Sequence, residues 1–585
     1  MFAGLIVIIV FLPILSLQGV EGKMFRPMAF TFMSAMTGAL ILSVTVIPVM
    51  ASLFLARRVS EKETFLVSWC KWVYRPLLTA ALTRPGLMLG GAVTVFALSI
   101  ALASTFGLEF VPKLDEGDIA IQATRLPSVS LEASIEMTKA MERTLLEFPQ
   151  VETVVSKTGR PEIANDPMGV HQTDIFVRLK AADGHEVPDY DKAELIEQMH
   201  AALKASVPSN SYSFTQPIEL RVQELVAGVR SDIGLSLFGD DLDMLEVEGD
   251  KIVRALASVP GAADVQAQQI AGLPYVRVII RRDAIARYGI NASDVLDATR
   301  VIGGHVVGEV FEGQRRFPLQ VRLAGRWRQD IERLGQLKIA DSRGRQIPLS
   351  QLATITVEDG PAEISRDAIR RRLLIQCNVR GRDLAGFVAD AQRTVADQVK
   401  LPAGYSLTWG GQFENLQRAS SRLLIAVPVA LFLIFSLVYL TFGSVKLTLL
   451  IYLNVPIAAT GGIVALWFRD MPFSISAGVG FIALFGIAVM NGVVLIEHIR
   501  HLRKTGSDQR TAIFEGSLDR LRPVLMTATT DALGFLPMAI SSSAGAEVQR
   551  PLATVVIGGL ATSMVLTLLV LPAIYPWFEP VADSE

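Results

Sequence analysis

Two segments near opposite ends of the chain repeat one another at a constant offset of 524 residues. Phe11-Leu12-Pro13 recurs as Phe535-Leu536-Pro537, and Arg26-Pro27 recurs as Arg550-Pro551. Each copy consists of an apolar run, a short polar loop and a second apolar run, which is typical of a transmembrane hairpin. The repeat indicates a duplicated membrane unit, of which we expect this chain to hold the last hairpin of the first copy and all of the second.

Eight apolar runs are each long enough to cross a hydrocarbon core, which takes about 20 helical residues. The charged residues, 19% of the chain, are concentrated between these runs. The sequence therefore predicts a membrane α-helical bundle with eight transmembrane helices, in the ranges 1–20, 27–56, 85–108, 423–445, 447–468, 471–496, 523–546 and 551–578.

Lys and Arg gather in two connections, 57–84 and 498–522. By the positive-inside rule both are expected on the cytoplasmic side, together with the tail 579–585, which places residues 109–420 outside. Trp69 and Trp72 suggest that the first connection forms an amphipathic helix lying along the inner membrane surface. A plain cytoplasmic linker helix is the alternative, and the sequence leaves both open.

The outer segment carries a weaker repeat at an offset of 111 residues, in which a helix ends near a proline and a short strand follows. The four matched pairs are Leu131 and Leu242, Arg143 and Arg254, Pro149 and Pro260, and Val154 and Val265. With the alternating strands around them, these patterns predict two α+β units of βαββαβ type. The predicted ranges are 109–230 for the first unit, 231–284 with 361–420 for the second, and 285–360 for a domain inserted in the second.

Several classes of protein lose support from the sequence. It contains no G-x-x-x-x-G-K-[ST] phosphate loop, no G-x-G-x-x-G after a strand, no H-E-x-x-H and no C-x-x-C motif. An ATP-driven pump in one chain, a nicotinamide enzyme and a structural zinc domain therefore lose support. The net charge of −2 provides no general basic surface for nucleic acid. By elimination we expect a transporter driven by an ion gradient, not an enzyme, and no cofactor.

Five motifs resemble the inner-membrane pumps of the resistance-nodulation-division (RND) superfamily. The last two resemble its heavy-metal efflux subfamily of cobalt-zinc-cadmium type. They are, in this order, residues 520–527 (RLRPVLMT), 480–492 (GFIALFGIAVMNG), 545–551 (GAEVQRP), 109–118 (EFVPKLDEGD) and 156–168 (SKTGRPEIANDPM).

The resemblance implies a twelve-span pump in two halves, of which this chain holds spans five to twelve; residues 1–56 would be the last hairpin of the first half. It implies periplasmic porter units with an inserted docking domain, and a homotrimer in the bacterial inner (plasma) membrane. The implied partners are a periplasmic adaptor (membrane fusion) protein and an outer-membrane channel. The implied activity is proton-driven export of a divalent metal ion, with acidic residues of the fourth span, before Met1, at the centre of proton uptake.

Carboxylate oxygens and histidine nitrogens suit Zn²⁺, Co²⁺, Ni²⁺ or Cd²⁺, whereas Cu⁺ and Ag⁺ prefer sulfur ligands. The candidate metal ligands are Glu162, Asp166, His171, Asp174 and Glu224. The resemblance favours divalent cations, because copper and silver members carry methionine at the positions of Glu224 and Gln172. The alternative is that these are solvated loop carboxylates and a surface histidine. The residue types do not rank the four divalent metals.

Asp531 is the only charge between residues 523 and 546, and an ionisable group within a membrane span is a functional candidate. Thr527 and Thr530 lie within one helical turn of it, and the family pattern places Asn491 on the opposed span. We expect these four residues to form part of a proton relay. The alternative is that Asp531 lies at a helix contact, where the threonines satisfy its carboxylate.

Two alternatives to metal export remain from the sequence. The first is a multidrug or lipid exporter of the same superfamily, which an apolar, phenylalanine-lined cleft would support. The second is a non-transporting remnant that assembles with a full-length pump.

Overall fold

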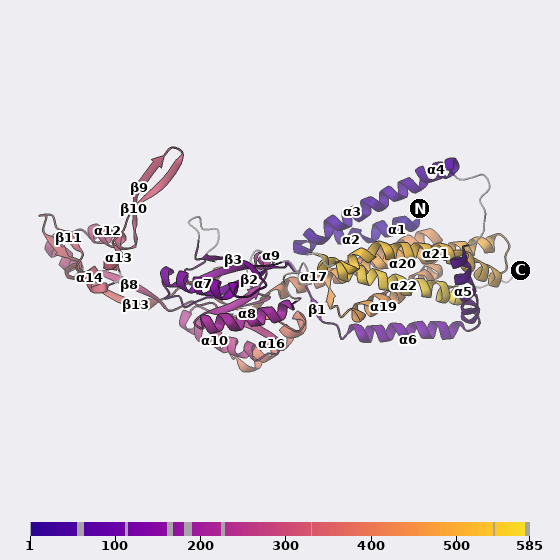
Figure 1. Ribbon diagram of the computed structural model, residues 1–585. Coiled ribbons are helices and arrows are strands. Elements are labelled where there is room, and N and C mark those ends of the chain that lie inside the picture. The colour runs from indigo at the N-terminus through magenta and orange to yellow at the C-terminus, as the bar shows by residue number, and fades with distance from the viewer. Residues whose placement is uncertain are drawn as a thin grey trace.

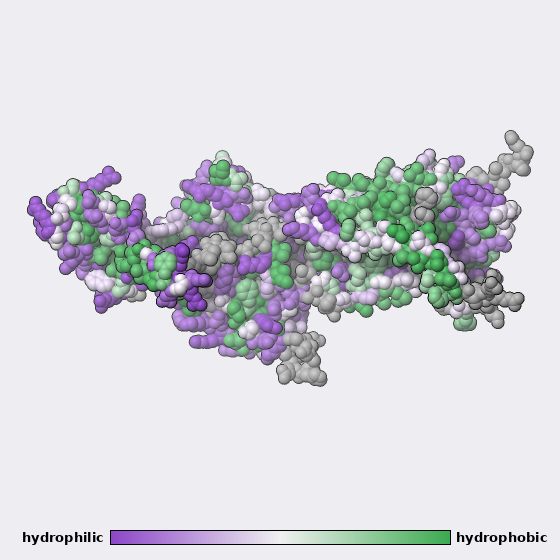
Figure 2. All heavy atoms as spheres, turned by 90° about the horizontal axis from the view of Figure 1, so that it is seen from above, coloured by the Kyte–Doolittle hydropathy of each residue, from purple (hydrophilic) through white to green (hydrophobic). Residues whose placement is uncertain are grey.

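A computed structural model of the chain describes residues 2–54, 64–110, 115–160, 168–180, 190–223, 229–328, 330–541 and 545–579. The molecule is elongated, with a bundle of helices at one end, two sheet-containing units in the middle and a smaller segment at the far end (Figure 1). Hydrophobic residues gather on the surface of the helical end, while the other end is mostly hydrophilic (Figure 2).

Within the described residues, seven helical segments are long and apolar enough to cross a membrane. They are Gly22–Val44 in α3 (Gly19–Val44), α6 (Pro85–Ala103), α17 (Gln412–Phe442), α18 (Val445–Tyr452) with α19 (Asn454–Phe468), α20 (Ile475–Lys504), α21 (Gln509–Ile540) and α22 (Ala546–Phe578). The sequence predicts eight. The described part of the remaining predicted span, residues 1–20, is divided between α1 (Phe2–Val10), α2 (Leu12–Leu15) and the first two residues of α3. Pro13 lies at this interruption and has no N–H for a helical hydrogen bond.

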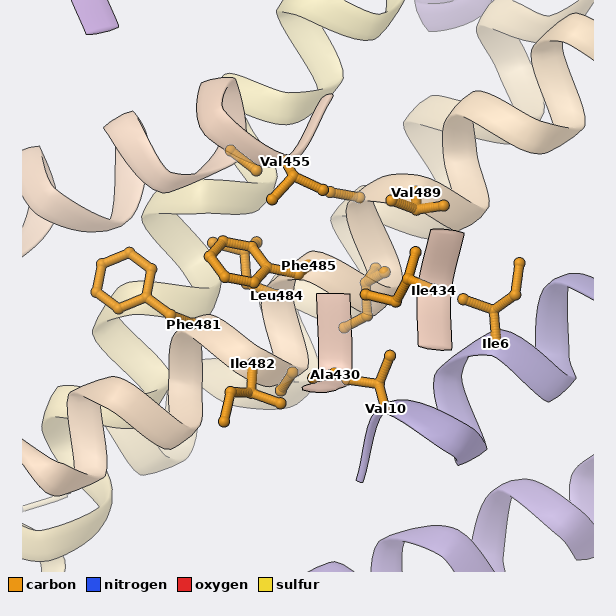
Figure 3. Packing of buried hydrophobic residues seen from close by; sticks show 14 of the residues in the cluster. Ile6, Val10, Ala430, Ile434, Val455, Phe481, Ile482, Leu484, Phe485 and Val489 are labelled. Atoms are coloured by element: carbon orange, nitrogen blue, oxygen red, sulfur yellow. The ribbon is translucent and has the colours of Figure 1, made fainter. Parts of the chain in front are cut away.

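The helix α20 lies at the centre of the bundle and is buried along most of its length. Ile6 and Val10 of α1 pack towards Ile434 of α17 and Val489 of α20 (Figure 3). The helices α19 and α22 approach closely because Gly558 has no side chain; a Cβ atom there would lie 2.5 Å from the carbonyl oxygen of Gly461. The bundle core is therefore formed by helices from both ends of the chain.

The first outer unit is a four-stranded antiparallel sheet with the strand order β3-β4-β2-β5. Its elements are β2 (Ile119–Thr124), α7 (Leu131–Leu146), β3 (Val151–Thr158), β4 (Gln172–Leu179), α8 (Lys192–Ser206) and β5 (Ser211–Thr215). One face of the sheet packs on α7 and α8 through residues such as Ile175 and Val177, which are fully buried. The opposite face is therefore left for polar side chains.

The second outer unit repeats this order of elements along the chain, with a long insertion between β7 and β15. Its elements are β6 (Ile233–Phe238), α10 (Leu242–Ala257), β7 (Ala262–Ala267), β15 (Arg370–Val379), α16 (Leu384–Gln398) and β16 (Ser406–Gly411). The strand order is β15-β6-β16, with β7 and the short β14 (Arg366–Asp367) also pairing with β15.

The inserted segment begins earlier than the sequence pattern indicates. The strand β8 (Leu273–Ile280), which lies in the range 231–284 assigned to the second unit, pairs along its whole length with β13 (Ala353–Gly360). These two strands form the stem of the insertion. Beyond them lie α11 (Arg282–Tyr288), α12 (Ala292–Gly303), α13 (Gly325–Arg328), α14 (Ile331–Gly335), β11 (Lys338–Ala340), β12 (Gln346–Pro348), α15 (Leu349–Leu352) and a projecting hairpin of β9 (His305–Glu312) and β10 (Arg315–Val321) (Figure 1).

The second unit is joined directly to the membrane bundle, because β16 ends at Gly411 and α17 begins at Gln412. Gly411 has a φ of 85°, and a Cβ atom there would lie 2.7 Å from the carbonyl oxygen of Asp232. The Asp232 carboxylate accepts hydrogen bonds from the Val379 amide (3.1 Å) and the Gln412 side chain (3.2 Å). These bonds fix the start of α17 to the sheet. The short strands β1 (Leu108–Glu109) and β17 (Phe473–Ser474) pair nearby.

Candidate metal site and proton path

Asp174 lies in β4, and its side chain is only 4% exposed. Since side chains alternate along a strand, Asp174 is on the face opposite Ile175 and Val177, away from the covering helices. The strand register places Gln122 of β2 beside Asp174, and Ser213 of β5 beside Gln122. A row of polar side chains therefore crosses the open face of the first sheet.

The Asp174 carboxylate accepts hydrogen bonds from two described side chains, Gln122 and Arg230. Gln122 donates a hydrogen bond from Nε2 over 3.3 Å, and Arg230 donates one from Nη1 over 3.3 Å. Arg230 comes from the segment just before β6, so this ion pair links the first unit to the second. A divalent cation binding to Asp174 would have to displace or share the carboxylate with the guanidinium, because both are positively charged.

The contact between the two units is polar at this face. The Asn378 amide donates to Ser213 Oγ over 3.1 Å and to Asp264 Oδ2 over 2.9 Å, and Arg380 forms an ion pair with Asp264 at 2.7 Å. Buried polar groups are tolerated there because they have partners. The candidate ligand Asp174 thus lies on a sheet face that meets the second unit through polar contacts.

His171 lies one residue before β4, and its backbone carbonyl accepts a hydrogen bond from the Arg125 amide over 2.9 Å. Burial lowers the pKa of the His171 imidazole below its ordinary value; Glu363 opposes this shift and Arg125 adds to it. The neutral imidazole is therefore favoured near pH 7, and only the neutral ring has a nitrogen lone pair for a metal. The Arg125 guanidinium is buried nearby and donates to Thr138 and Thr173.

The structure describes two of the five candidate ligands. Asp174 and His171 lie near the beginning of β4, whereas Glu162, Asp166 and Glu224 lie outside the described residues. In the part of the chain that is described, no three His, Cys, Asp or Glu side chains gather in a way that could hold a metal ion. The ligand set of five residues stays a prediction.

Sequence reasoning missed the two partners of Asp174. Gln122 interrupts the otherwise apolar stretch Ile119–Ala123, and this isolated polar residue was a signal of a polar neighbour on the adjacent strand. Arg230 gave no such signal, because it approaches Asp174 only after the two units pack together.

A cavity of about 1200 Å³ lies where the two units meet the outer end of the membrane bundle. Acidic side chains outnumber basic ones in its lining, which includes Glu109, Asp115, Glu197, Glu219, Asp383, Asp470, Lys192, Arg380 and Arg382. Lys192 binds Asp115 at 2.6 Å and lowers the pKa of that carboxyl group. The remaining lining carries an excess of negative charge, which attracts cations.

Asp531 lies in α21 and is partly buried. Among the described residues, no hydrogen bond or ion pair reaches its carboxylate. The Thr527 hydroxyl donates to the carbonyl oxygens of Pro523 and Val524, each at 3.1 Å, and Thr530 is exposed. Asn491 is 4% exposed in α20 and has no described hydrogen bond to Asp531. The four relay candidates therefore occupy neighbouring helices without forming a hydrogen-bonded chain in this state.

A buried polar pair in the bundle was not foreseen. Asn454 of α19 is 1% exposed, accepts a hydrogen bond from Thr567 of α22 over 3.2 Å, and donates to the Ala488 carbonyl of α20 over 3.5 Å. It lies next to the backbone of Gly492, where a Cβ atom would come within 2.5 Å of Asn454 Nδ2. A single asparagine in an apolar run was the only sequence signal for it.

The sequence profile of the AcrB/AcrD/AcrF family matches residues 1–579. The chain belongs to this family. It is 48% identical over 581 residues to the cobalt-zinc-cadmium resistance protein CzcA of Cupriavidus metallidurans, covering 98% of this chain and 55% of CzcA. It is 44% identical to the nickel-cobalt-cadmium resistance protein NccA of Alcaligenes xylosoxydans xylosoxydans, covering 98% and 54%.

The fold is also that of a solved heavy metal efflux pump. The crystal form I structure of that pump matches with a TM-score of 0.90 at 37% sequence identity, over 99% of this chain and 58% of the pump. The predicted membership of the RND superfamily and its heavy-metal efflux branch is confirmed, as is a multi-pass membrane protein with a mixed α/β outer part. The chain spans about half the length of the relatives it matches.

Proposed function

We propose that this chain is the C-terminal part of a proton-driven exporter of divalent heavy-metal cations of the Zn, Co, Cd and Ni class. The observation that carries the proposal is Asp174, a buried carboxylate on the polar sheet face that meets the second unit, in a chain 48% identical to CzcA. The names of CzcA and NccA refer to resistance to these metals.

Three features support a cation as the transported substrate. The carboxylate of Asp174 is an oxygen ligand, and His171 offers a nitrogen that burial keeps neutral. The cavity between the units and the bundle has an excess of acidic side chains. The drug- or lipid-exporting alternative needs an apolar cleft, and this lining also includes Phe106, Phe214 and Trp467, so the acidic excess and not an absence of apolar side chains is what favours a cation.

Proton coupling is assigned to Asp531. A carboxylate that is partly buried in a span and has no described partner can gain and lose a proton at small structural cost. Thr527, Thr530 and Asn491 would supply hydrogen bonds when the helices shift. Family membership supports the further proposals of a homotrimer in the bacterial inner membrane, with a periplasmic adaptor protein and an outer-membrane channel as partners.

A hybrid pump tests the proposal. The part of C. metallidurans CzcA that precedes its match to this chain is joined to residues 1–585, and the hybrid is expressed in a metal-sensitive bacterium. We expect higher tolerance of at least one of Zn²⁺, Co²⁺, Cd²⁺ and Ni²⁺, and proton-driven accumulation of that ion in inside-out vesicles. The chain alone and the CzcA part alone are the controls.

Three outcomes would contradict the proposal. A correctly inserted hybrid that gives no tolerance to any of the four ions would rule out divalent-metal export. Export of a hydrophobic dye without metal export would favour the drug-exporting alternative. If the hybrid gives no tolerance but co-expression of the chain changes the tolerance that an intact CzcA provides, an assembling remnant would be favoured.

A further inference from the structure

The helix α5 (Phe65–Thr83) is not one of the candidate membrane spans and runs across the direction of those spans at the end of the bundle away from the sheets (Figure 1). One face of α5 is anchored to the bundle. Tyr74 donates a hydrogen bond to the Leu568 carbonyl over 2.6 Å, and Leu78 and Ala81 are fully buried. The orientation of α5 on the bundle is therefore fixed by packing.

The opposite face of α5 is apolar and exposed. Phe65 is 84% exposed, Trp69 53%, Trp72 73% and Leu77 50%. Spacings of four and three residues place Phe65, Trp69 and Trp72 on one face of the helix, and Leu77 lies to the side of that face. Indole rings are enriched at the boundary between lipid headgroups and water, because they combine an apolar body with a polar N–H. An exposed stripe with two tryptophans at the end of a membrane bundle favours this boundary over water.

The charges of α5 are all positive. Lys71 and Arg75 lie on it, and the helix contains no Asp or Glu. Arg75 is exposed and has no ionic partner among the described residues. It lines a hollow of about 540 Å³ together with Trp72, Val73, Pro76 and Leu77. A guanidinium at the edge of an apolar hollow matches a phospholipid, because the phosphate can accept two N–H bonds while the acyl chain contacts the apolar wall.

We propose that the exposed face of α5 is a docking surface for acidic phospholipids of the leaflet on its side of the membrane. Phe65, Trp69 and Trp72 lie at headgroup depth, and Arg75 binds the lipid phosphate in the hollow beside Trp72. Selection for an acidic lipid over a zwitterionic one comes from net charge, because phosphatidylcholine also has a phosphate but carries a choline cation. This proposal depends on the membrane placement of the chain and is independent of which ion it exports.

Fluorescence quenching in bilayers tests the proposal. The full chain carrying Trp467→Phe and Trp577→Phe, which removes the tryptophans of the other apolar helices, is reconstituted in phosphatidylcholine bilayers. The bilayers contain a small equal fraction of either brominated phosphatidylglycerol or brominated phosphatidylcholine. Bromine quenches tryptophan at contact, so quenching reports which lipid lies against Trp69 and Trp72. We expect stronger quenching by the acidic lipid at low salt, decreasing at 1 M salt, where charges are screened beyond about 3 Å.

Matched charge variants separate Arg75 from the general surface charge. One basic side chain near an anionic surface is worth about 1 kcal/mol, or about a fivefold enrichment of the acidic lipid. Arg75→Gln should lower the enrichment by about that factor. Arg510→Gln removes an exposed charge from the nearby α21 and should leave the enrichment unchanged. Quenching by brominated phosphatidylcholine should persist in Arg75→Gln, which shows that α5 still lies on lipid.

Each of the following three results would contradict the proposal. Equal quenching by the two lipids would show a lipid-facing helix without headgroup selection. An equal loss in Arg75→Gln and Arg510→Gln would assign the selection to overall charge. No quenching by either lipid would show that α5 faces water or is covered by protein, such as a second copy of the chain.

Discussion

The outer units and the membrane bundle treat a buried carboxylate in opposite ways. Asp174, between the two outer units, is held by Arg230 and Gln122, each at 3.3 Å. Asp531, in the bundle, has no hydrogen-bonding or ionic partner among the described residues. A charge with a fixed cationic partner is kept ionised, whereas a carboxylate without one can change its protonation state when its surroundings change.

Under the proposed function, this difference suits separate roles for the two regions. A metal site would need a carboxylate that stays negative, because a divalent cation must find it charged. A proton-coupling site would need one that binds and releases a proton during each cycle. Variants that remove the two carboxylates should therefore have different effects. Loss of the Asp531 carboxylate should impair proton coupling with little loss of stability. Loss of the Asp174 carboxylate should weaken the contact between the outer units.

The largest effect is expected for Asp531→Asn in the hybrid with CzcA. The amide has the same shape but cannot carry a proton, so proton-driven metal accumulation in vesicles should decrease by about a hundredfold or more, as when a proton-transferring side chain is removed. Because Asp531 has no described partner, thermal stability in detergent should change little, by less than about 0.5 kcal/mol. Leu533→Ala, two residues away in the same helix and 60% exposed, is the control for local packing.

If proton-driven transport survives in Asp531→Asn, Asp531 is not part of the relay and the proposed difference between Asp174 and Asp531 does not hold. A large loss of stability in Asp531→Asn would also contradict that difference, since it would show that the Asp531 carboxylate has a structural partner. Asn491→Ala is informative only if Asp531→Asn abolishes coupling, because Asn491 would then be the nearby donor to examine.

The membrane spans could be predicted because each is a long apolar run with at most one charged residue, and such a run favours the hydrocarbon core. Their ends were less predictable. The helix α17 begins at Gln412, well before the predicted start at 423, because a polar amphipathic stretch continues the helix outside the membrane. The stem strand β8 was assigned to the second unit because its alternation resembles that of any strand; only pairing with β13 reveals its place.

The second largest effect is expected for Asp174→Ala. It removes the ion pair with the Arg230 guanidinium, which is 14% exposed, and breaking such a buried pair typically costs about 3–5 kcal/mol. Native-state hydrogen exchange of the β4 amides in the full chain measures this loss as faster exchange. The double variant Asp174→Ala with Arg230→Met should recover part of it, because it removes both charges of the pair.

If Asp174→Ala and the double variant exchange equally fast, the ion pair between Asp174 and Arg230 contributes nothing to the stability of β4. The pair could not be predicted from sequence for a physical reason. Strand alternation determines the face on which Asp174 lies, but the approach of Arg230 depends on how the two units pack. The bundle pair of Asn454 and Thr567, on helices α19 and α22, illustrates the same limit.

The smallest effect concerns the protonation of His171. Its pKa is lowered in the folded chain by burial, with Arg125 adding to the shift and Glu363 opposing it. The unfolded chain therefore binds the proton more readily, and acidification below the ordinary pKa of 6.5 should destabilise the folded state. Above about pH 7.5 the contribution of His171 to the free energy of unfolding should be constant. At lower pH that free energy cannot change by more than about 1.4 kcal/mol per pH unit, because one proton is involved. Comparing wild type with His171→Gln, without metal, isolates this term in the exchange of the β4 amides.

The sign of the stability difference between wild type and His171→Gln on acidification shows whether His171 is neutral or protonated in the outer site. If wild type loses stability relative to His171→Gln on acidification, His171 stays neutral near pH 7 and its nitrogen remains available to a metal ion. If wild type instead gains stability on acidification, Glu363 outweighs burial and Arg125, and the imidazole is a cation held by a carboxylate. His171 would then repel a divalent metal, and Asp174 would have to bind it with other ligands.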